Sequence, residues 1–580
     1  MLSTRIREDR KDQQFKLSAV TETGRAESSI EVPKQRSYNG SKLVIPRSLA
    51  DTPCATLGVQ GVLDALNAIL ETSHTLPTAA SSSTSPASLA PSSASSVQDQ
   101  LSRLSILKDF IERNYDFGTA YALLRPVWKE VSFSNAQDKL RRRERKDSER
   151  RRKALVGNRI VDKYLRPRRV WDLFSNRVVP SWINNKWITP ISHAWVDEKD
   201  RVAVQTPING QEWPVPLPKD ADLNLIRIEM LNLGLEHTWL DILCLRQKGG
   251  PREDLRVAEW RLDVPTIGRV YRGADVVIYL SGLGRPLRLK EGDLDSDRSW
   301  FRRAWTVQEV GSQRIIAGDI PDGPMHAQRI YGGKYKTALL TRFHKELHSV
   351  EKAGLKTFVA LENMQKRVST NPVDRVAGLA FILGLRRIPV YHESETVEDA
   401  WTALVNAMQP ILRVHFLLLY PAVGLGSKKW RPSWGQVMTE PPPKDVRIVA
   451  YNKAVYHDDK TQEDWSDVVC IERGCVRGFN VGSAEEHGDR CGELVVEAAD
   501  GSTRTFKIRV AHRFLIPEDT YALLGCDLSP CRQWAIGRRL PDQRFEKVSV
   551  IEMGSYHEVD RLWEYTTRFK LLKKSRYILI

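Results

Sequence analysis

Residues 191–195 read Ile191-Ser-His-Ala-Trp195, an apolar run that ends in polar and aromatic side chains. Two later stretches have the same character, Trp239-Leu-Asp-Ile-Leu-Cys-Leu-Arg-Gln247 and Arg303-Ala-Trp-Thr-Val-Gln-Glu309. Short apolar runs that alternate with helix-like segments indicate a parallel α/β sheet. In such a sheet the functional residues gather at the carboxyl ends of the strands. We therefore expect an α/β domain over residues 165–320, with its site at that edge.

Four strands are predicted in this domain. They cover residues 187–192, 238–245, 275–280 and 314–317. A helix is predicted over 222–234, because apolar residues recur at helical spacing between Asp222 and Gly234. A second helix is predicted from Pro251, and Pro265 is expected to break or kink it.

The rest of the chain divides by composition. Residues 1–76 predict a polar extension with little fold of its own, in which residues 57–70 have the apolar spacing of one short helix. Residues 77–98 form a linker of Ser, Ala, Thr and Pro. Residues 101–155 predict a helical segment that ends in a basic run, and residues 321–440 predict a helical region. Residues 445–580 alternate polar and apolar side chains and predict an antiparallel β-rich domain.

The formal net charge of +16 is concentrated in one place. Residues 139–153 (KLRRRERKDSERRRK) hold ten basic and three acidic residues, which gives +7. Such a run is more typical of a solvated helix of mixed charge than of a nucleic-acid site, so nucleic acid is not an expected partner. A nuclear import signal is the other interpretation of the run.

The seven cysteines do not form a disulfide framework over such a length, which favours a reducing compartment. Cys470 with Cys475 and Cys526 with Cys531 share one spacing, and Cys491 lies between them. No histidine completes a zinc-binding pattern, so we expect buried thiols and no metal site. Neither a signal peptide nor a membrane span is predicted, and we expect an intracellular location, cytoplasmic rather than nuclear.

Several side chains near the predicted strand ends are candidates for a site. Ser192, His193 and Trp195 follow the first strand and Gln247 follows the second, which makes them candidates for substrate binding. Asp241 lies inside the second predicted strand, where a carboxylate must be hydrogen-bonded, and we interpret it as a structural anchor rather than a catalytic group.

Trp305 and Glu309 lie four residues apart on a helix predicted from Trp300, and so on one face of it. An aromatic ring beside a carboxylate suits a ligand with a flat ring and sugar hydroxyls. A core tryptophan beside an ion-paired glutamate explains the two residues equally well.

The three quoted stretches, in this order, resemble the signature blocks of the HET (heterokaryon incompatibility) domain family of filamentous fungi. Residues 269–280 (RVYRGADVVIYL) and the sequence Ser299-Trp-Phe-Arg-Arg-Ala304 extend the similarity, and residues 367–385 and 430–434 resemble the region that often follows this domain. The resemblance implies fungal non-self recognition, regulated cell death and a domain similar to the TIR (Toll/interleukin-1 receptor) fold, a flavodoxin-like parallel sheet.

Some TIR domains cleave NAD with a glutamate placed four residues after a tryptophan. The resemblance therefore implies that Glu309 is a catalytic residue, that NAD is a substrate, and that no cofactor is needed. A non-catalytic module that signals death by self-assembly with protein partners is the alternative from a different functional class.

Overall fold

The structure is a computed structural model of the 580-residue chain. It describes residues 15–17, 38, 40–77, 91–130, 132–183, 186–320, 322–349, 356–443, 454–479, 490–525 and 532–580. The chain divides into two compact units. The first unit comprises residues 1–351 and 390–392, and the second comprises residues 352–389 and 393–580.

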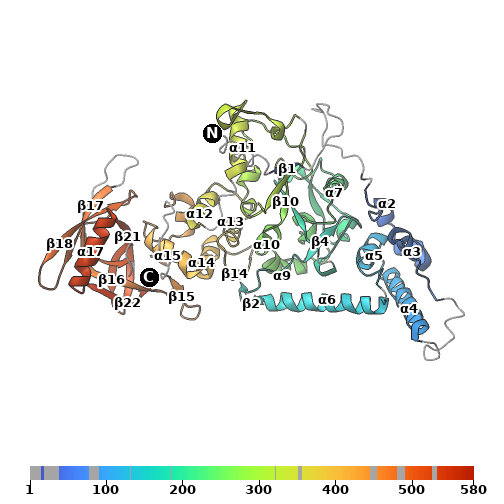
Figure 1. Ribbon diagram of the computed structural model, residues 1–580, viewed down its shortest axis with the longest axis horizontal. Coiled ribbons are helices and arrows are strands. Elements are labelled where there is room, and N and C mark those ends of the chain that lie inside the picture. Colours follow the sequence, from blue (N-terminus) through green and yellow to red (C-terminus); the bar gives the residue numbers. More distant parts are fainter. Residues whose placement is uncertain are drawn as a thin grey trace. The chain divides into compact units, whose positions relative to one another are not determined.

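A seven-stranded sheet lies at the centre of the first unit (Figure 1). Its strands are β1 (Phe15–Leu17), β4 (Arg169–Asp172), β5 (Arg177–Pro180), β6 (Thr189–His193), β9 (His237–Trp239), β10 (Asp275–Tyr279) and β11 (Gln313–Ile316). The spatial order is β1-β11-β10-β6-β9-β4-β5, parallel from β1 to β9 and antiparallel at β4 and β5. The expected α/β class is confirmed, with a mixed sheet in place of a purely parallel one.

The direction in which the chain adds strands to the sheet reverses beside β6. From β6 the chain passes through α7 (Leu223–Asn232) to β9 on one side, and from β9 it passes through α9 (Asp254–Asp263) and α10 (Ile267–Tyr271) to β10 on the other side. Loops that leave neighbouring strands in opposite directions open a crevice at the carboxyl ends of those strands. The ends of β6 and β10 are therefore the expected place for a ligand.

The predicted helices are present with adjusted bounds. The Asp222 side chain accepts a hydrogen bond from the Asn224 amide at the start of α7, and Gly234, with a φ of 76°, follows its end. The second helix begins at Asp254 rather than at Pro251. Pro265 lies between α9 and α10, so the predicted break is confirmed.

The prediction of one strand over residues 238–245 is wrong. Strand β9 ends at Trp239, and the rest of the apolar run forms the short helix α8 (Asp241–Cys244). Ile242, Leu243 and Cys244 are all buried there. A short apolar run has no periodicity that distinguishes a buried strand from a buried helical turn.

The expectation that residues 1–76 have little fold is also wrong for the described part. Residues 40–77 contain α2 (Arg47–Ala50) and α3 (Cys54–Leu70), and residues 15–17 add the edge strand β1 to the sheet. Helix α3 packs with α4 (Pro91–Glu112), α5 (Phe117–Leu124) and α6 (Phe133–Ala154) around an apolar core. The predicted linker therefore ends at residue 90 rather than 98, and residues 78–90 lie outside the described residues.

The second unit joins a helical part to a closed antiparallel sheet. Its elements are α12 (Thr357–Gln365), α13 (Val373–Ala377), β14 (Ile388–Pro389), α14 (Val397–Ala407), α15 (Pro410–Leu418), α16 (Trp434–Thr439), β15 (Tyr456–His457), β16 (Asp464–Arg477), β17 (Arg490–Glu497), β18 (Thr503–Val510), β19 (Asp519–Gly525), β20 (Gln533–Leu540), β21 (Arg544–Met553), α17 (Tyr556–Arg568) and β22 (Leu572–Leu579). The strand order runs β16-β17-β18-β21-β20-β19, and β19 pairs again with β16, so the sheet closes on itself. The β-rich C-terminal region is confirmed, whereas the helical region expected over 321–440 is divided between the two units.

Lys547 of β21 fastens the closed sheet to the helical part of the second unit. Its ammonium donates hydrogen bonds to the carbonyl oxygens of Phe416 and Tyr420, both at 2.6 Å, and of Trp430 at 3.4 Å. The side chain is fully buried, and burial lowers the pKa of Lys547 from 10.5 to about 7. Three carbonyl acceptors match the three donors of the charged form.

This lowered pKa predicts a pH-dependent stability of the second unit. Between pH 7 and 10.5 the unfolded chain holds a proton on Lys547 that the folded chain has released, so stability rises with pH in this window. We expect urea unfolding of the wild type to show a gain on the order of 3 kcal/mol between pH 6.5 and 9.5. The gain should be absent in Lys547→Met and retained in Lys460→Met, which changes an exposed lysine. An equal gain in all three proteins would contradict this assignment.

Candidate functional site

Ser192 and Glu309 form the centre of a buried polar cluster at the end of β6. The Ser192 hydroxyl donates a 2.5 Å hydrogen bond to Glu309 Oε2 and accepts one of 2.8 Å from Trp300 Nε1. Glu309 is 8% exposed, and Ser192 and Trp300 are 1% exposed. The hydroxyl therefore links an indole to a carboxylate that the rest of the chain has almost removed from water.

The segment that carries Glu309 is not the single α-helix that we predicted. It forms two short 3₁₀ turns, Trp300–Arg302 and Trp305–Gln308, separated by Arg303 in an extended conformation. The Thr306 hydroxyl donates to the carbonyl oxygens of Trp300 and Arg303, at 2.6 and 2.9 Å. These side-chain contacts compete with the backbone hydrogen bonds of a continuous helix. Contrary to our prediction, Trp305 and Glu309 therefore do not share one helical face.

His193 follows Ser192 and pairs with Asp241. His193 Nε2 lies 2.9 Å from Asp241 Oδ1, and the same oxygen accepts a 2.8 Å hydrogen bond from the Ile242 amide. Asp241 lies at the start of α8 and is partly exposed, so it is not inside a strand as predicted. Burial alone would lower the pKa of His193, but Asp241, with a smaller contribution from Glu309, raises it above 6.5.

This pair predicts a change in the titration of one histidine. In Asp241→Asn burial becomes the dominant influence, and we expect the pKa of His193 to fall from above to below its ordinary value in an NMR titration. The raised pKa stabilises the fold at pH values below the ordinary histidine pKa, and this stabilisation disappears as the pH rises through the raised value. Asp254→Asn, which removes an exposed carboxylate, should leave the titration of His193 unchanged. A His193 pKa that does not move in Asp241→Asn would contradict the pairing.

Tyr271 completes the cluster from α10. Its hydroxyl donates a 3.0 Å hydrogen bond to the Ile191 carbonyl, and its ring meets Trp239 edge to face. Burial raises the pKa of Tyr271 well above 10, and the charges of Glu309 and Asp241 add to the rise. The phenol is therefore a neutral hydrogen-bond donor that braces β6 beside the two carboxylates.

A cavity of about 690 Å³ opens next to this cluster. Its lining comes from the loops after β6 and β10 and from residues 285–301, and includes Ala194, Trp195, Ser281, Arg285, Arg298 and Phe301. Ser192, His193 and Glu309 do not line it, whereas Ala194, which follows His193, and Ser299 and Phe301, on either side of Trp300, do. The cavity therefore begins where the buried cluster ends, at the reversal of the strand order.

The remaining candidates lie in different surroundings. Trp195 lines the cavity, and the Arg201 guanidinium lies over its ring at 5.2 Å. The Trp305 ring lies near Tyr391, with ring centroids 6.5 Å apart. The Gln247 amide donates to the carbonyl of Leu245, two residues earlier, after α8 rather than after a strand. The structure thus brings Ser192, His193, Asp241 and Glu309 together, and places Trp195 at the cavity.

Three contributions were not predicted: the indole of Trp300, the phenol of Tyr271 and the basic lining from Arg285 and Arg298. Trp300 and Tyr271 lie within the stretches that carry the family resemblance, so those stretches contained a signal for them. Arg285 and Arg298 lie in an irregular loop without periodicity. Both arginines already contact carboxylates, Arg285 with Asp220 and Arg298 with Asp197.

The five cysteines that the structure describes form no second site. Burial raises the pKa of Cys54 and Cys244 to about 12 and also raises that of Cys470. Cys491 is exposed, so the expectation of buried thiols is wrong there, and Cys526 and Cys531 lie outside the described residues. Within the described ranges, no group of three or more His, Cys, Asp or Glu side chains is placed to hold a metal ion.

The helices of the described ranges include none that combines the length and the apolar character needed to cross a membrane. Comparisons of the chain with protein-family models, with curated proteins and with solved structures give no match. The case for a function therefore depends on the geometry of the cluster and the cavity, together with the resemblance in the sequence.

Proposed function

We propose that this chain is an effector of the heterokaryon-incompatibility type, acting in fungal non-self recognition and regulated cell death, and that its TIR-like first unit hydrolyses NAD with Glu309. The observation that carries the proposal is the buried Ser192–Glu309 pair at the carboxyl end of β6, where the strand order reverses. The adjoining cavity of about 690 Å³ lies in the size range of small-molecule sites.

The chemistry needs one carboxylate. The bond between the ribose and the nicotinamide nitrogen breaks, and its electron pair leaves with nicotinamide, which becomes a neutral ring. The ribose carbon becomes oxocarbenium-like, and a negative charge held beside it stabilises that transition state. Water then adds to this carbon, and a proton is released, so the products are nicotinamide, ADP-ribose and H⁺.

The cavity offers suitable partners for the rest of the dinucleotide. Trp195 and Phe301 provide aromatic surface for a flat ring. Arg285 and Arg298 pair with Asp220 and Asp197 in this structure, and would exchange these carboxylates for the pyrophosphate. Glu309 is shielded from this cavity while it accepts the hydrogen bond of Ser192, whose hydroxyl in turn accepts one from Trp300. We infer that turnover requires the two 3₁₀ turns of residues 300–308 to move, so that the carboxylate reaches the ribose.

The alternative is a non-catalytic assembly module, and one observation favours it. The Glu309 carboxylate is buried and accepts a hydrogen bond from the Ser192 hydroxyl, as a structural carboxylate does. In this case Glu309 maintains the fold of the 300–309 segment, and death signalling depends on contacts between copies of the chain and with protein partners.

The test is the product mixture formed from NAD by the purified full-length chain. Chromatography should detect nicotinamide and ADP-ribose in equal amounts, increasing with time and with protein concentration. Analytical ultracentrifugation of the same samples reports self-association. Self-association without nicotinamide, at every concentration, would contradict the hydrolase and favour the assembly module.

A further inference from the structure

Helix α6 (Phe133–Ala154) is 22 residues long, about 33 Å. It contacts the rest of the first unit along one face, here called the seam. The seam residues recur every three or four positions, as one helical face requires. They are Ala136, Leu140, Arg143, Asp147, Arg151 and Ala154. Each of them is buried or partly buried, whereas most of the other residues from 138 to 153 are exposed.

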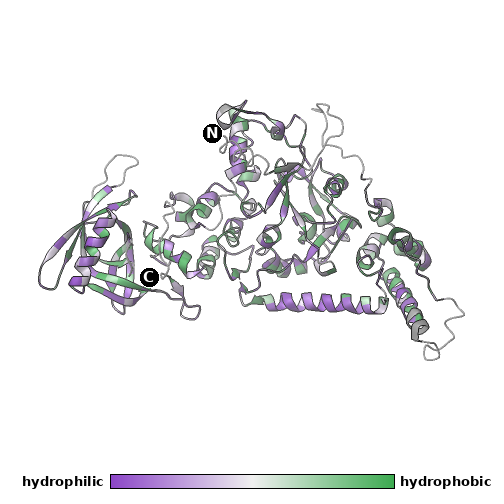
Figure 2. Cartoon of the chain, in the orientation of Figure 1, coloured by the Kyte–Doolittle hydropathy of each residue, from purple (hydrophilic) through white to green (hydrophobic). Residues whose placement is uncertain are grey.

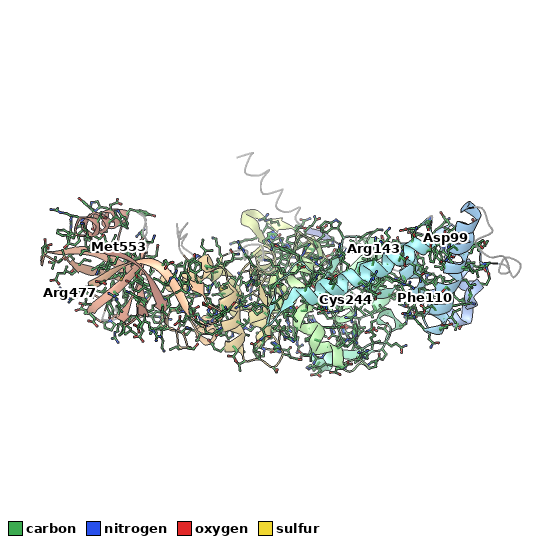
Figure 3. The ribbon with its side chains drawn as sticks, turned by 90° about the horizontal axis from the view of Figure 1, so that it is seen from below. Asp99, Phe110, Arg143, Cys244, Arg477 and Met553 are labelled. Atoms are coloured by element: carbon green, nitrogen blue, oxygen red, sulfur yellow. The ribbon has the colours of Figure 1, made fainter. Side chains whose placement is uncertain are left out.

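The seam is held by polar contacts of two arginines. Arg143, labelled on α6 in Figure 3, donates to the Ile183 carbonyl at 3.1 Å. Arg151 pairs with Asp147 at 2.8 Å and with Asp263 at 3.4 Å, and donates to the Arg166 carbonyl at 3.0 Å. The arginines that fix the helix are therefore already occupied.

The opposite face of α6 carries exposed cations, of which Arg142 donates a 3.4 Å hydrogen bond to the Asp138 carbonyl. In the part of the chain that the structure describes, no carboxylate lies within 4.0 Å of Arg142, Arg145, Lys146 or Arg152. These four residues, here called the cationic face, are exposed and fall on one side of the helix at spacings of three, four and seven residues. Glu149 falls on the same side and pairs with Lys153 at 2.6 Å, which leaves the face with a net positive charge. Figure 2 shows α6 as hydrophilic along most of its length, unlike the helices of the core.

We propose that the cationic face binds the phosphate backbone of double-stranded DNA without sequence preference. Residues 141–153 include no aromatic or aliphatic side chain, so this face has nothing to insert into a lipid surface or to stack on single-stranded bases. A straight helix with arginine and lysine on its outer side matches the regular charge of a duplex, whose major groove admits an α-helix. Contacts of exposed cations with phosphates carry no sequence information, so this binding should not depend on the DNA sequence.

The sequence run alone does not lead to this inference, because ten basic residues beside three acidic ones describe a mixed-charge helix equally well. The structure separates the run into cations that anchor the helix and cations that have no carboxylate partner. This binding is independent of the chemistry proposed at Glu309.

The experiment is a fluorescence-anisotropy titration of a labelled random-sequence 20-base-pair DNA duplex with the full-length chain, at several salt concentrations between 50 and 200 mM. We expect the variant R142Q/R145Q/K146Q/R152Q to bind at least tenfold more weakly at 50 mM salt. The slope of log affinity against log salt should decrease in magnitude by about 3 to 4, because each phosphate contact contributes about 0.9. A matched control, R473Q/K507Q/R513Q/R544Q, removes the same charge from exposed residues of the second unit and should change neither quantity by more than twofold.

Three results would overturn the proposal. The first is no binding of the duplex by the wild type at 50 mM salt, and the second is equal weakening in the control, which would indicate general charge attraction. The third is tighter binding, through the cationic face, of duplex RNA, single-stranded DNA, poly-glutamate or vesicles of anionic lipid than of duplex DNA. Circular dichroism of both variants, with unchanged helical signal, ensures that a loss of binding is not a loss of fold.

Discussion

The variant Arg177→Met is expected to destabilise the first unit by about 3–5 kcal/mol, because it leaves a largely buried carboxylate without its partner. Arg177 of β5 is 1% exposed, and its guanidinium contacts both carboxylate oxygens of Asp116 at 2.9–3.1 Å. It also donates 2.8 Å hydrogen bonds to the Ala50 carbonyl and to Asp51. One side chain thus fastens the N-terminal helices to the edge of the sheet.

The measurement is urea unfolding of the first unit, together with limited trypsin digestion. Digestion of Arg177→Met should release residues 40–130 under conditions in which the wild type is intact. Arg113→Met is the matched control, since Arg113 pairs with Asp109 on the surface, where an ion pair is screened by water and its loss should leave the unfolding midpoint nearly unchanged. Equal stability of Arg177→Met and the wild type would show that the N-terminal helices are held by apolar packing alone.

The variant Glu309→Gln is expected to lower the rate of NAD hydrolysis by about 10²–10³-fold, because it removes the negative charge that stabilises the ribose cation. The substituted amide keeps a carbonyl oxygen that accepts the Ser192 hydroxyl, so the fold of the 300–309 segment should persist. We therefore expect the rate to change much more than the midpoint of thermal unfolding.

Ser192→Ala separates the two roles of the cluster. It removes the hydrogen bond that restrains Glu309 without removing the charge, so hydrolysis should persist or increase while stability decreases by about 1–3 kcal/mol. Loss of activity in Ser192→Ala at unchanged stability would assign the hydroxyl a direct role in catalysis instead.

The sheet was the part of the fold that the sequence predicted best. The strands over 275–280 and 314–317 are present within one residue, because β-branched apolar runs such as Val276 to Ile278 admit few alternatives. Helices over residues 57–70 and 101–155 were predicted, but their packing into one core was missed, since α3 and α5 are stabilised by contacts distant in the sequence, such as Arg177 with Asp116, which no local pattern reveals. The wrong prediction for residues 238–245 has a different cause, the ambiguity of a short apolar run.

The candidate site was predicted only in part. Ser192 and His193 lie at the end of β6, as the sequence pattern implies. Asp241 and Glu309 reach them from α8 and from the loop after a 3₁₀ turn, which the sequence pattern did not predict. The position of Trp305 depended on a continuous helix, and the extended Arg303 breaks it. The cavity could not be predicted, because irregular loops line most of it.

The most direct test of the account is the rate of nicotinamide release from NAD by the wild type and by Glu309→Gln, measured side by side on folded protein at high concentration. The exposed-carboxylate variant Glu291→Gln serves as the control. We expect release by the wild type and by the control, and a loss of about 10²–10³-fold in Glu309→Gln at an unchanged unfolding midpoint. Equal rates in all three proteins, or no release by the wild type even when it self-associates, would contradict it.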